Sequence, residues 1–320
     1  MRRSQRTGEQ PAFQFDELTL LLGSQPTAVR AICEHAGEYP ENLAFRPEFG
    51  QKVEACVVRD GAAGPGRWRR LRRGARVVGR SVGPAIGLTL PRLLRSPVWS
   101  SATADAGGVG VLVAPGFAGT DASMAVLRAW FRRLGYRPIG ADLRWNVGCS
   151  TELVDRLERR VEAHVAATGG PVVLLGHSRG GWLCRLVAVR RPELVRGLIM
   201  LGSPVLNPLD AQGWVMLALR MIVGLSDRGV RGLLGADCLS GACREVTERD
   251  LAAELTVPAL AIYSREDGVV GWRSCQDPAA EWVEVRSSHH GLGTDPEVYQ
   301  AMAARLRRWA GTRSNAPERA

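Results

Sequence analysis

Residues 172–181 read VVLLGHSRGG, an apolar run of strand length that passes into G-x-S-x-G and then into a segment of helical character. Gly176 and Gly180 carry no Cβ, so a strand and a helix can approach closely where the chain turns between them. Ser178 would then take a strained backbone conformation, with its hydroxyl exposed at the end of the strand and above a helix N-terminus. The motif and its flanking segments predict a nucleophile elbow, rather than a glycine-rich turn with only a structural role.

A serine hydroxyl is a poor nucleophile unless a base takes its proton, and an imidazole held in one tautomer by an acid suits that role. Two of the five histidines, His289 and His290, lie in the run SSHHGLG at 287–293, which follows a strand-like segment. One of these two is expected to be the base. The other histidines are His35 in the N-terminal segment, His164 at an expected surface position of a helix, and His177 inside the elbow.

The acid is expected between the serine and the histidine pair in the sequence. The apolar run PALAIY at 258–263 reads as a strand, and Asp267 follows it in a loop, directly before a glycine. A carboxylate at this place can orient a histidine, although an Asp-Gly pair can also serve only as a turn. Glu266 is the nearest rival for the role, and Asp277 is a more distant one.

An oxyanion is best stabilised by backbone N–H groups that are already in place. One such group is expected from Arg179, the residue after the serine. A second strand-like run, VGVLVA at 109–114, is followed by Pro-Gly and then by Phe117, whose N–H is our candidate for the second donor. This turn could also act as a helix cap through Thr120 or Asp121, and the two roles are compatible.

Taken together, these motifs resemble the α/β-hydrolase superfamily, specifically its lipase/esterase-like members, over residues 98–310. The resemblance implies the chain order serine, aspartate, histidine. In relatives the last motif reads S-H-x-G-L-G, with the catalytic histidine directly after the serine, which favours His289 over His290. The implied fold is the α/β-hydrolase fold, a mostly parallel, doubly wound sheet with helices on both faces and a small cap insertion.

The arrangement of apolar runs predicts the same fold class. Apolar strands that alternate with amphipathic helices give a mostly parallel sheet covered on both faces. A chain of 320 residues with 45% apolar residues can form one such domain and an additional segment. The expected strands are 109–114, 137–141, 172–176, 197–202, 258–263 and 281–285, and the expected helices are 122–134, 151–168, 181–190 and 296–310.

Residues 204–255 interrupt this alternation within a hydrolase domain expected over 98–312. They include the apolar stretch WVMLALRMIV at 214–223, which must bury against something. Insertions at this point in α/β hydrolases usually form a cap. We expect a lid that binds an acyl chain, although an ordinary packing helix would have the same pattern. The expected substrate-binding residues are Trp214, Met216 and Leu219.

The terminal segments carry fewer signals. Residues 1–97 form a helical and basic segment of unknown role, and residues 313–320 are expected to be a disordered tail. The run RWRRLRR at 67–73 beside an apolar stretch suggests a linker, with weak association with an anionic membrane surface as the alternative. Nucleic-acid binding is not expected from one arginine cluster without a binding fold. No segment reaches the ~18–20 apolar residues of a membrane span, so we expect a cytoplasmic protein.

The charge and the cysteines constrain partners and cofactors. The formal net charge is +10, but Lys52 is the only lysine, a bias typical of a bacterial genome of high GC content rather than of acidic partners. The seven cysteines match no metal-binding spacing, so we expect reduced thiols and neither a metal nor an organic cofactor. A Cys238–Cys243 or a Cys149–Cys275 disulfide is the alternative.

The sequence thus predicts a serine hydrolase that cleaves a carboxylic ester, with a small-molecule ester or acyl compound as substrate and no obligate protein partner. Acyl transfer or thioester hydrolysis on the same scaffold is an alternative, because only the acceptor or the leaving group differs. A non-catalytic binding protein of the same fold is a second alternative. The presence of a serine, an aspartate and a histidine in the expected order argues against it.

Overall fold

The computed structural model describes residues 89–100 and 106–311; the expectations for most of the N-terminal segment and for the tail lie outside this part of the chain. The described part of the chain is built around a parallel sheet of six strands in the order β2-β1-β3-β4-β5-β6. The expected α/β fold class is confirmed, and each expected strand is present. The strands are β1 (Gly110–Ala114), β2 (Arg137–Gly140), β3 (Val172–His177), β4 (Val195–Leu201), β5 (Ala259–Tyr263) and β6 (Glu281–Glu284).

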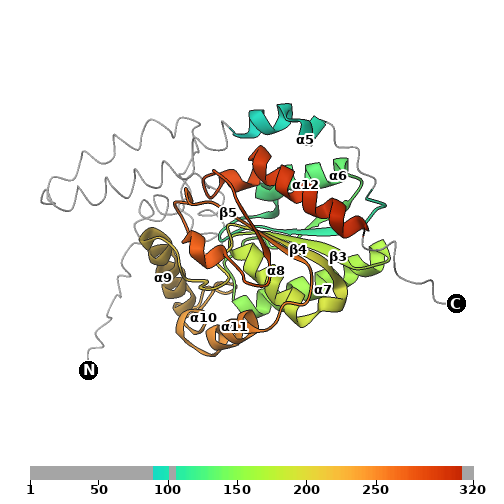
Figure 1. Cartoon of the computed structure of the whole chain (residues 1–320). Coiled ribbons are helices and arrows are strands. Elements are labelled where there is room, and N and C mark those ends of the chain that lie inside the picture. The colour runs from blue at the N-terminus through green and yellow to red at the C-terminus, as the bar shows by residue number, and fades with distance from the viewer. Residues whose placement is uncertain (1–88, 101–105, 312–320) are drawn as a thin grey trace, which may run out of the picture.

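The strands β1, β3 and β5 are buried along their whole length, because helices cover both faces of the sheet (Figure 1). Successive residues of a strand point to opposite faces, so Leu174 packs in one apolar layer and Leu175 in the other. Both side chains are fully buried. The first layer is formed with α7 (Ser150–Thr168), α8 (Arg179–Arg190) and α11 (Ala242–Ala252), and the second with α5 (Pro97–Ser100), α6 (Ala125–Arg133) and α12 (Pro296–Gly311).

Helix α7 shows how the apolar pattern of the sequence determines the packing. Leu153, Leu157 and Val161 recur at a spacing of four residues, so they form one stripe that packs against the sheet. His164 lies close to the same stripe and is buried, with its ring Nε2 2.8 Å from the carbonyl oxygen of Arg137. The expectation that His164 lies at the surface is therefore wrong, because the end of α7 packs over β2.

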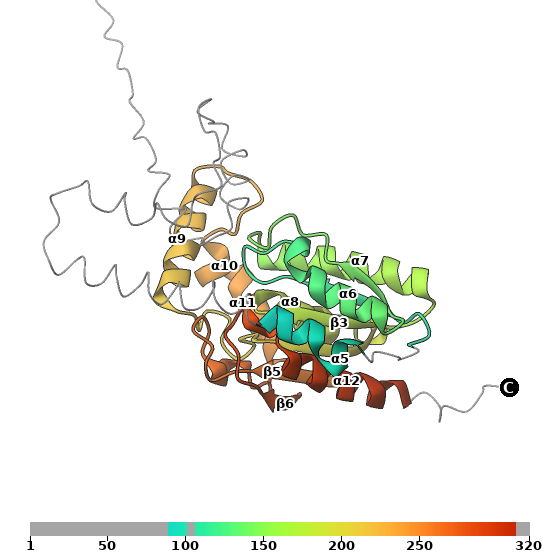
Figure 2. The ribbon, with the colours of Figure 1, turned by 90° about the horizontal axis from the view of Figure 1, so that it is seen from above.

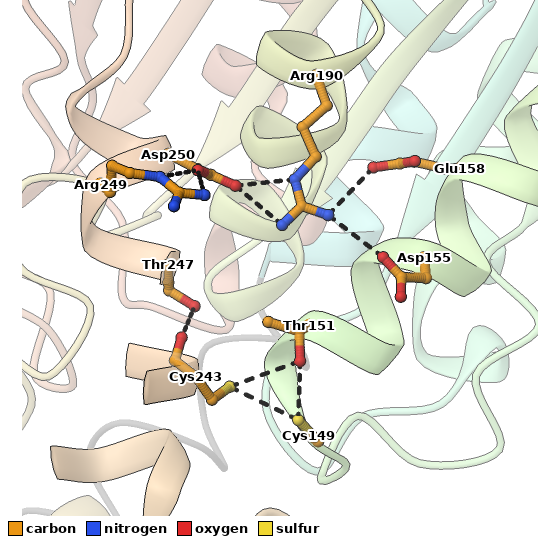
Figure 3. A network of polar contacts seen from close by, with 9 residues as sticks. All are labelled: Cys149, Thr151, Asp155, Glu158, Arg190, Cys243, Thr247, Arg249 and Asp250. Atoms are coloured by element: carbon orange, nitrogen blue, oxygen red, sulfur yellow. Dashed lines mark hydrogen bonds and ion pairs between the residues drawn. The ribbon is translucent and has the colours of Figure 1, made fainter. Parts of the chain in front are cut away.

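The insertion between β4 and β5 has two parts with different contacts. Helix α11 is tied to the helices that cover the sheet, where Arg190 of α8 contacts Asp250 of α11 and Asp155 and Glu158 of α7 (Figure 3). Helix α9 (Gly213–Asp227) instead lies beyond one end of the sheet in both ribbon views (Figures 1 and 2). In the described ranges, no helix has the length and apolar character that crossing a membrane requires.

Candidate active site

The turn between β3 and α8 holds Ser178 in the conformation expected of a nucleophile elbow. Its φ is 52° and its ψ is −123°, a strained combination for a residue with a side chain. A Cβ on Gly176 would lie 2.3 Å from the backbone of Gly180, and one on Gly180 would lie 2.4 Å from the carbonyl oxygen of Pro115. The Ser178 N–H donates to the carbonyl oxygen of Leu201 at 2.8 Å, which fixes the turn against β4.

Asp267 and His289 meet although 22 residues separate them in the chain. His289 Nδ1 lies 2.6 Å from Asp267 Oδ2, and both side chains are almost completely buried. The other carboxylate oxygen, Oδ1, accepts the N–H groups of Val269 and Val270 at 2.8 and 3.0 Å. Since Nδ1 faces the carboxylate, Nε2 is the ring nitrogen left to act as a base.

The same contacts determine the charge of Asp267. Burial alone would raise the pKa of this carboxyl group, because water no longer solvates the anion. The charge and hydrogen bond of His289, with the two backbone N–H groups, outweigh burial and hold the pKa of Asp267 below its ordinary value. The carboxylate is therefore ionised at neutral pH, as the orienting acid of an imidazole must be.

The structure places the rival residues elsewhere. Glu266 is exposed in the same loop. Asp277 is buried in an ion pair, with its Oδ2 2.5 Å from Nε of Arg185. The ring centre of His290 lies 5.5 Å from that of His289, and it is His289 that contacts Asp267. The geometry therefore favours Asp267 and His289 as the acid and the base.

A buried histidine joins this pair to the elbow. The Nε2 of His177 lies 2.9 Å from the carbonyl oxygen of His289, and the two ring centres are 4.7 Å apart. Burial, reinforced by the neighbouring charges of His289 and His290, lowers the pKa of His177 to about 3. His177 is thus a neutral donor to a carbonyl group, which positions the histidine loop beside Ser178.

This buried imidazole predicts a dependence of stability on pH. Below a pH of about 6.5 the unfolded chain binds a proton at residue 177, whereas the folded chain does not until the pH approaches 3. Stability should therefore fall as the pH is lowered, and His177 should contribute about 1.4 kcal/mol per pH unit over this range. Urea unfolding from pH 7 to 4 measures the slope. His177→Gln keeps a donor but cannot titrate, so an unchanged slope in this variant would contradict the assignment.

The turn after β1 lies directly against the nucleophile elbow. A Cβ on Gly116 would lie 3.0 Å from Nδ1 of His177 and 3.2 Å from Cβ of Ser178, closer than ordinary contacts, so a side chain here would push against the elbow. Phe117 follows at once, which places its N–H in the turn that borders Ser178. Arg179 is the first residue of α8, where an N–H has no acceptor within its own helix. Both candidate oxyanion donors thus border the serine.

Asn146 positions this region, although nothing in the sequence singles it out. It is completely buried, and its side-chain amide donates to the carbonyl oxygen of Pro115 at 2.8 Å. Its own carbonyl oxygen accepts the N–H of Ala118 at 3.1 Å, and its N–H donates to the carbonyl oxygen of Gly119 at 3.1 Å. These three bonds fix the turn that holds Phe117. They join segments about 30 residues apart, so no local pattern reveals them.

The side chain of Arg179 points away from the serine and into the protein. Its guanidinium donates to the carbonyl oxygens of Asn146 and Gly148 at 3.1 and 2.8 Å, and to Ser150 Oγ at 3.1 Å. Burial lowers the pKa of Arg179 to about 10, and nearby cysteine thiols oppose this effect. The residue therefore links the elbow to the loop that precedes α7.

The expected substrate-binding residues all belong to α9. Leu219 is buried, and Trp214 and Met216 are partly buried, in an apolar cluster that also includes Phe117 and Val269. Phe117 follows β1 and Val269 follows Asp267, so one face of α9 packs over two loops of the candidate site. Within the part of the chain that the structure describes, the buried indole N–H of Trp214 has no hydrogen-bond partner.

Comparisons with known proteins agree with this architecture. Residues 111–231 match the family described as alpha/beta hydrolase fold. No curated protein matches the chain by sequence. The mature Bacillus licheniformis lipase BlEst2 superposes with a TM-score of 0.50 at 14% identity, over 63% of this chain and 94% of the lipase. A monoacylglycerol lipase of Paleococcus ferrophilus gives a TM-score of 0.46 at 15% identity, over 66% of this chain and 96% of the lipase.

At these identities the likeness to solved structures concerns the fold and not the activity. The family match covers β1 to the end of α9, which includes the elbow and the turn after β1. The match ends before β5 and β6, but these two strands continue the same parallel sheet, which supports the same fold for that part of the chain. The chain has the α/β-hydrolase fold.

Proposed function

We propose that this protein is a serine hydrolase that cleaves a carboxylic ester through an acyl-enzyme intermediate. The observation that carries the proposal is the buried contact of 2.6 Å between His289 and Asp267, on loops that adjoin a strained Ser178. A histidine oriented in this way serves as a base for a neighbouring hydroxyl group. No described contact of these groups suggests a different reaction.

Each step uses a group already described. Ser178 Oγ attacks the carbonyl carbon of the ester and gives its proton to Nε2 of His289. The N–H groups of Phe117 and Arg179 stabilise the oxyanion. His289 returns the proton to the leaving alcohol, and a water molecule activated by the same nitrogen then releases the acid. Asp267 stays ionised throughout and stabilises the imidazolium that forms.

Labelling with a fluorophosphonate tests the nucleophile. The wild-type protein should be labelled at Ser178, because this reagent traps activated serines, and Ser178→Ala should abolish labelling while the fold is retained. Ser203→Ala is a matched control, since Ser203 is another buried serine near the elbow. Mass spectrometry locates the label, and circular dichroism checks the fold. Labelling that persists in a folded Ser178→Ala protein would remove Ser178 as the nucleophile.

A series of p-nitrophenyl esters tests the substrate class. If α9 covers the acyl chain, each buried CH₂ group contributes about 0.8 kcal/mol, nearly a fourfold gain in kcat/KM. We therefore expect kcat/KM to rise between acyl lengths of ~4 and ~8 carbons. Met216→Glu should flatten this rise and spare acetyl esters. Leu217→Glu is a control, because Leu217 is on the same helix but is 49% exposed.

Two outcomes would contradict this substrate class. If Met216→Glu reduced activity equally on short and long esters, or simply unfolded the protein, α9 would be a packing helix and not part of an acyl site. A wild-type preference for acetyl esters would exclude lipid-like substrates. Product analysis with and without an added alcohol or thiol distinguishes hydrolysis from acyl transfer, because only transfer yields a new ester or thioester.

A further inference from the structure

Three cysteine thiols converge at a place that the proposed reaction does not use. Cys149 directly precedes α7, Cys238 lies in α10 (Asp237–Ser240) and Cys243 lies in α11. The sulfur of Cys243 is 3.3 Å from that of Cys238 and 3.6 Å from that of Cys149, and all three sulfurs lie within 4.8 Å of one another. Figure 3 shows two of them, together with the hydroxyl of Thr151.

The surroundings of the three thiols favour negative charge. Cys149 is the residue directly before α7, so its sulfur lies at the N-terminus of this helix, where the first N–H groups have no acceptor within the helix. Thr151 adds a hydroxyl group 3.2 Å from the sulfur of Cys149. Donors from a helix N-terminus stabilise thiolates, which are the form of cysteine that binds metals.

Arg179 supplies the opposite charge. It is only 7% exposed, and the three groups that accept its hydrogen bonds are neutral. Among the residues that the structure describes, it makes no ion pair with a carboxylate. A buried guanidinium needs a counter-charge, and the thiols of the cluster interact favourably with it, in addition to the ring of Trp182, whose centre is 5.6 Å away. A net negative charge at the cluster would therefore balance this buried cation.

We propose that Cys149, Cys238 and Cys243 bind one zinc ion, with a water molecule as the fourth ligand. Three thiolates and one Zn²⁺ have a net charge of −1, which the guanidinium of Arg179 neutralises. Binding forms three Zn–S bonds and releases to solvent every proton that the three thiols still carry, without any redox step. Tetrahedral coordination with three protein ligands and a water is a common arrangement for zinc.

The charge and the number of sulfurs distinguish zinc from other occupants. A disulfide would use two of the sulfurs, leave the third without a role and give Arg179 no counter-charge. Cu⁺ with three thiolates would leave a charge of −2 against one guanidinium. The proposal departs from our sequence-based expectation of no metal, because Cys149 is 94 residues from Cys243 and the pair Cys238/Cys243 alone suggests no site.

A bound ion would add metal–sulfur bonds between two parts of the protein that are distant in the sequence. It would tie the loop before α7 to α10 and α11, next to the side chain of Arg179. Zinc should therefore raise the temperature of unfolding, since a ligand that binds only the folded state stabilises it. This effect does not depend on the proposed hydrolase activity, so the two proposals can fail separately.

The test uses the full chain, reduced and freed of metal, and measures Zn²⁺ binding by elemental analysis after dialysis and by competition with a chromogenic chelator. We expect one zinc per chain. The zinc affinity should fall more than about 100-fold in each of three ligand variants, Cys149→Ser, Cys238→Ser and Cys243→Ser. A loss of this size exceeds what is expected when a residue that only hydrogen-bonds a metal ligand is removed. Cys184→Ser and Cys275→Ser are matched controls in buried thiols outside the cluster and should bind as the wild type does. Co²⁺ in place of zinc should give the absorption of a tetrahedral thiolate site.

Alkylation of the wild-type protein keeps the test decisive if a variant fails to fold. Zinc should protect Cys149, Cys238 and Cys243 from iodoacetamide, as read by peptide mass spectrometry. Binding of less than one equivalent at micromolar zinc, equal affinity in the ligand and control variants, or unprotected thiols would each overturn the proposal. A Cys238–Cys243 or Cys149–Cys243 disulfide in protein purified without reductant would also overturn it.

Discussion

Alanine in place of His289 is expected to lower kcat for ester hydrolysis about 1,000-fold or more, because members of a catalytic triad act as a unit. The residue supplies the only proposed base, and its Nδ1 makes the 2.6 Å contact with Asp267. His290→Ala is the matched control, since this ring is adjacent, with its centre 5.5 Å from that of His289. Its effect should be far smaller. Steady-state kinetics on a soluble p-nitrophenyl ester measures both.

The acid is tested by a second matched pair. Asp267→Asn should lower kcat by up to about 10,000-fold, because an amide favours the wrong tautomer of His289. Glu266→Gln changes the neighbouring carboxylate, which is exposed, and should leave kcat close to the wild-type value. If kcat fell more in His290→Ala than in His289→Ala, the base would be His290. If kcat fell more in Glu266→Gln than in Asp267→Asn, the acid would be Glu266.

The largest expected effect on stability concerns the buried ion pair of Asp277 and Arg185. Their side chains are 1% and 6% exposed, and the carboxylate also accepts the N–H of Ala279 at 3.0 Å. Asp277→Ala leaves the guanidinium buried without a counter-charge and should lower the free energy of unfolding by about 3–5 kcal/mol. Urea unfolding measures the loss.

Two comparisons isolate the ion pair from other effects. Glu193→Ala removes an exposed partner of Arg191 at 2.7 Å and should leave the free energy of unfolding close to the wild-type value. The double change Arg185→Met with Asp277→Leu removes both charges and should recover most of the stability. If the double variant were as unstable as Asp277→Ala, the cost would come from packing and not from the unpaired charge.

The fold could be predicted because its signals are local. Most of the runs that become strands are separated by helical patterns, as residues 172–177 are preceded by the helix at 150–168. The period of the apolar residues and the length of the run distinguish strands from helices. The proposed nucleophile and histidine loops were also found locally, because short motifs with glycine surround Ser178 and His289.

What could not be predicted depends on contacts between distant segments. Asn146 contacts Pro115, and Cys149 contacts Cys243, across 31 and 94 residues. Burial of His164 also depends on a strand that precedes its helix, since its partner is the carbonyl group of Arg137. Side-chain type and periodicity carry no information about such pairs until the order of the strands in the sheet is known.

The order of the strands also affects how the protein recovers from denaturation. Ser178 follows β3, Asp267 follows β5 and His289 follows β6, an edge strand whose neighbour in the sheet is β5. Parallel strands pair only after long loops have closed, which is slow compared with helix formation. A refolding chain can thus regain its helical circular dichroism while β6 is still unpaired and the proposed base is out of place. Regained turnover therefore reports complete assembly of the sheet, which a regained helical signal does not.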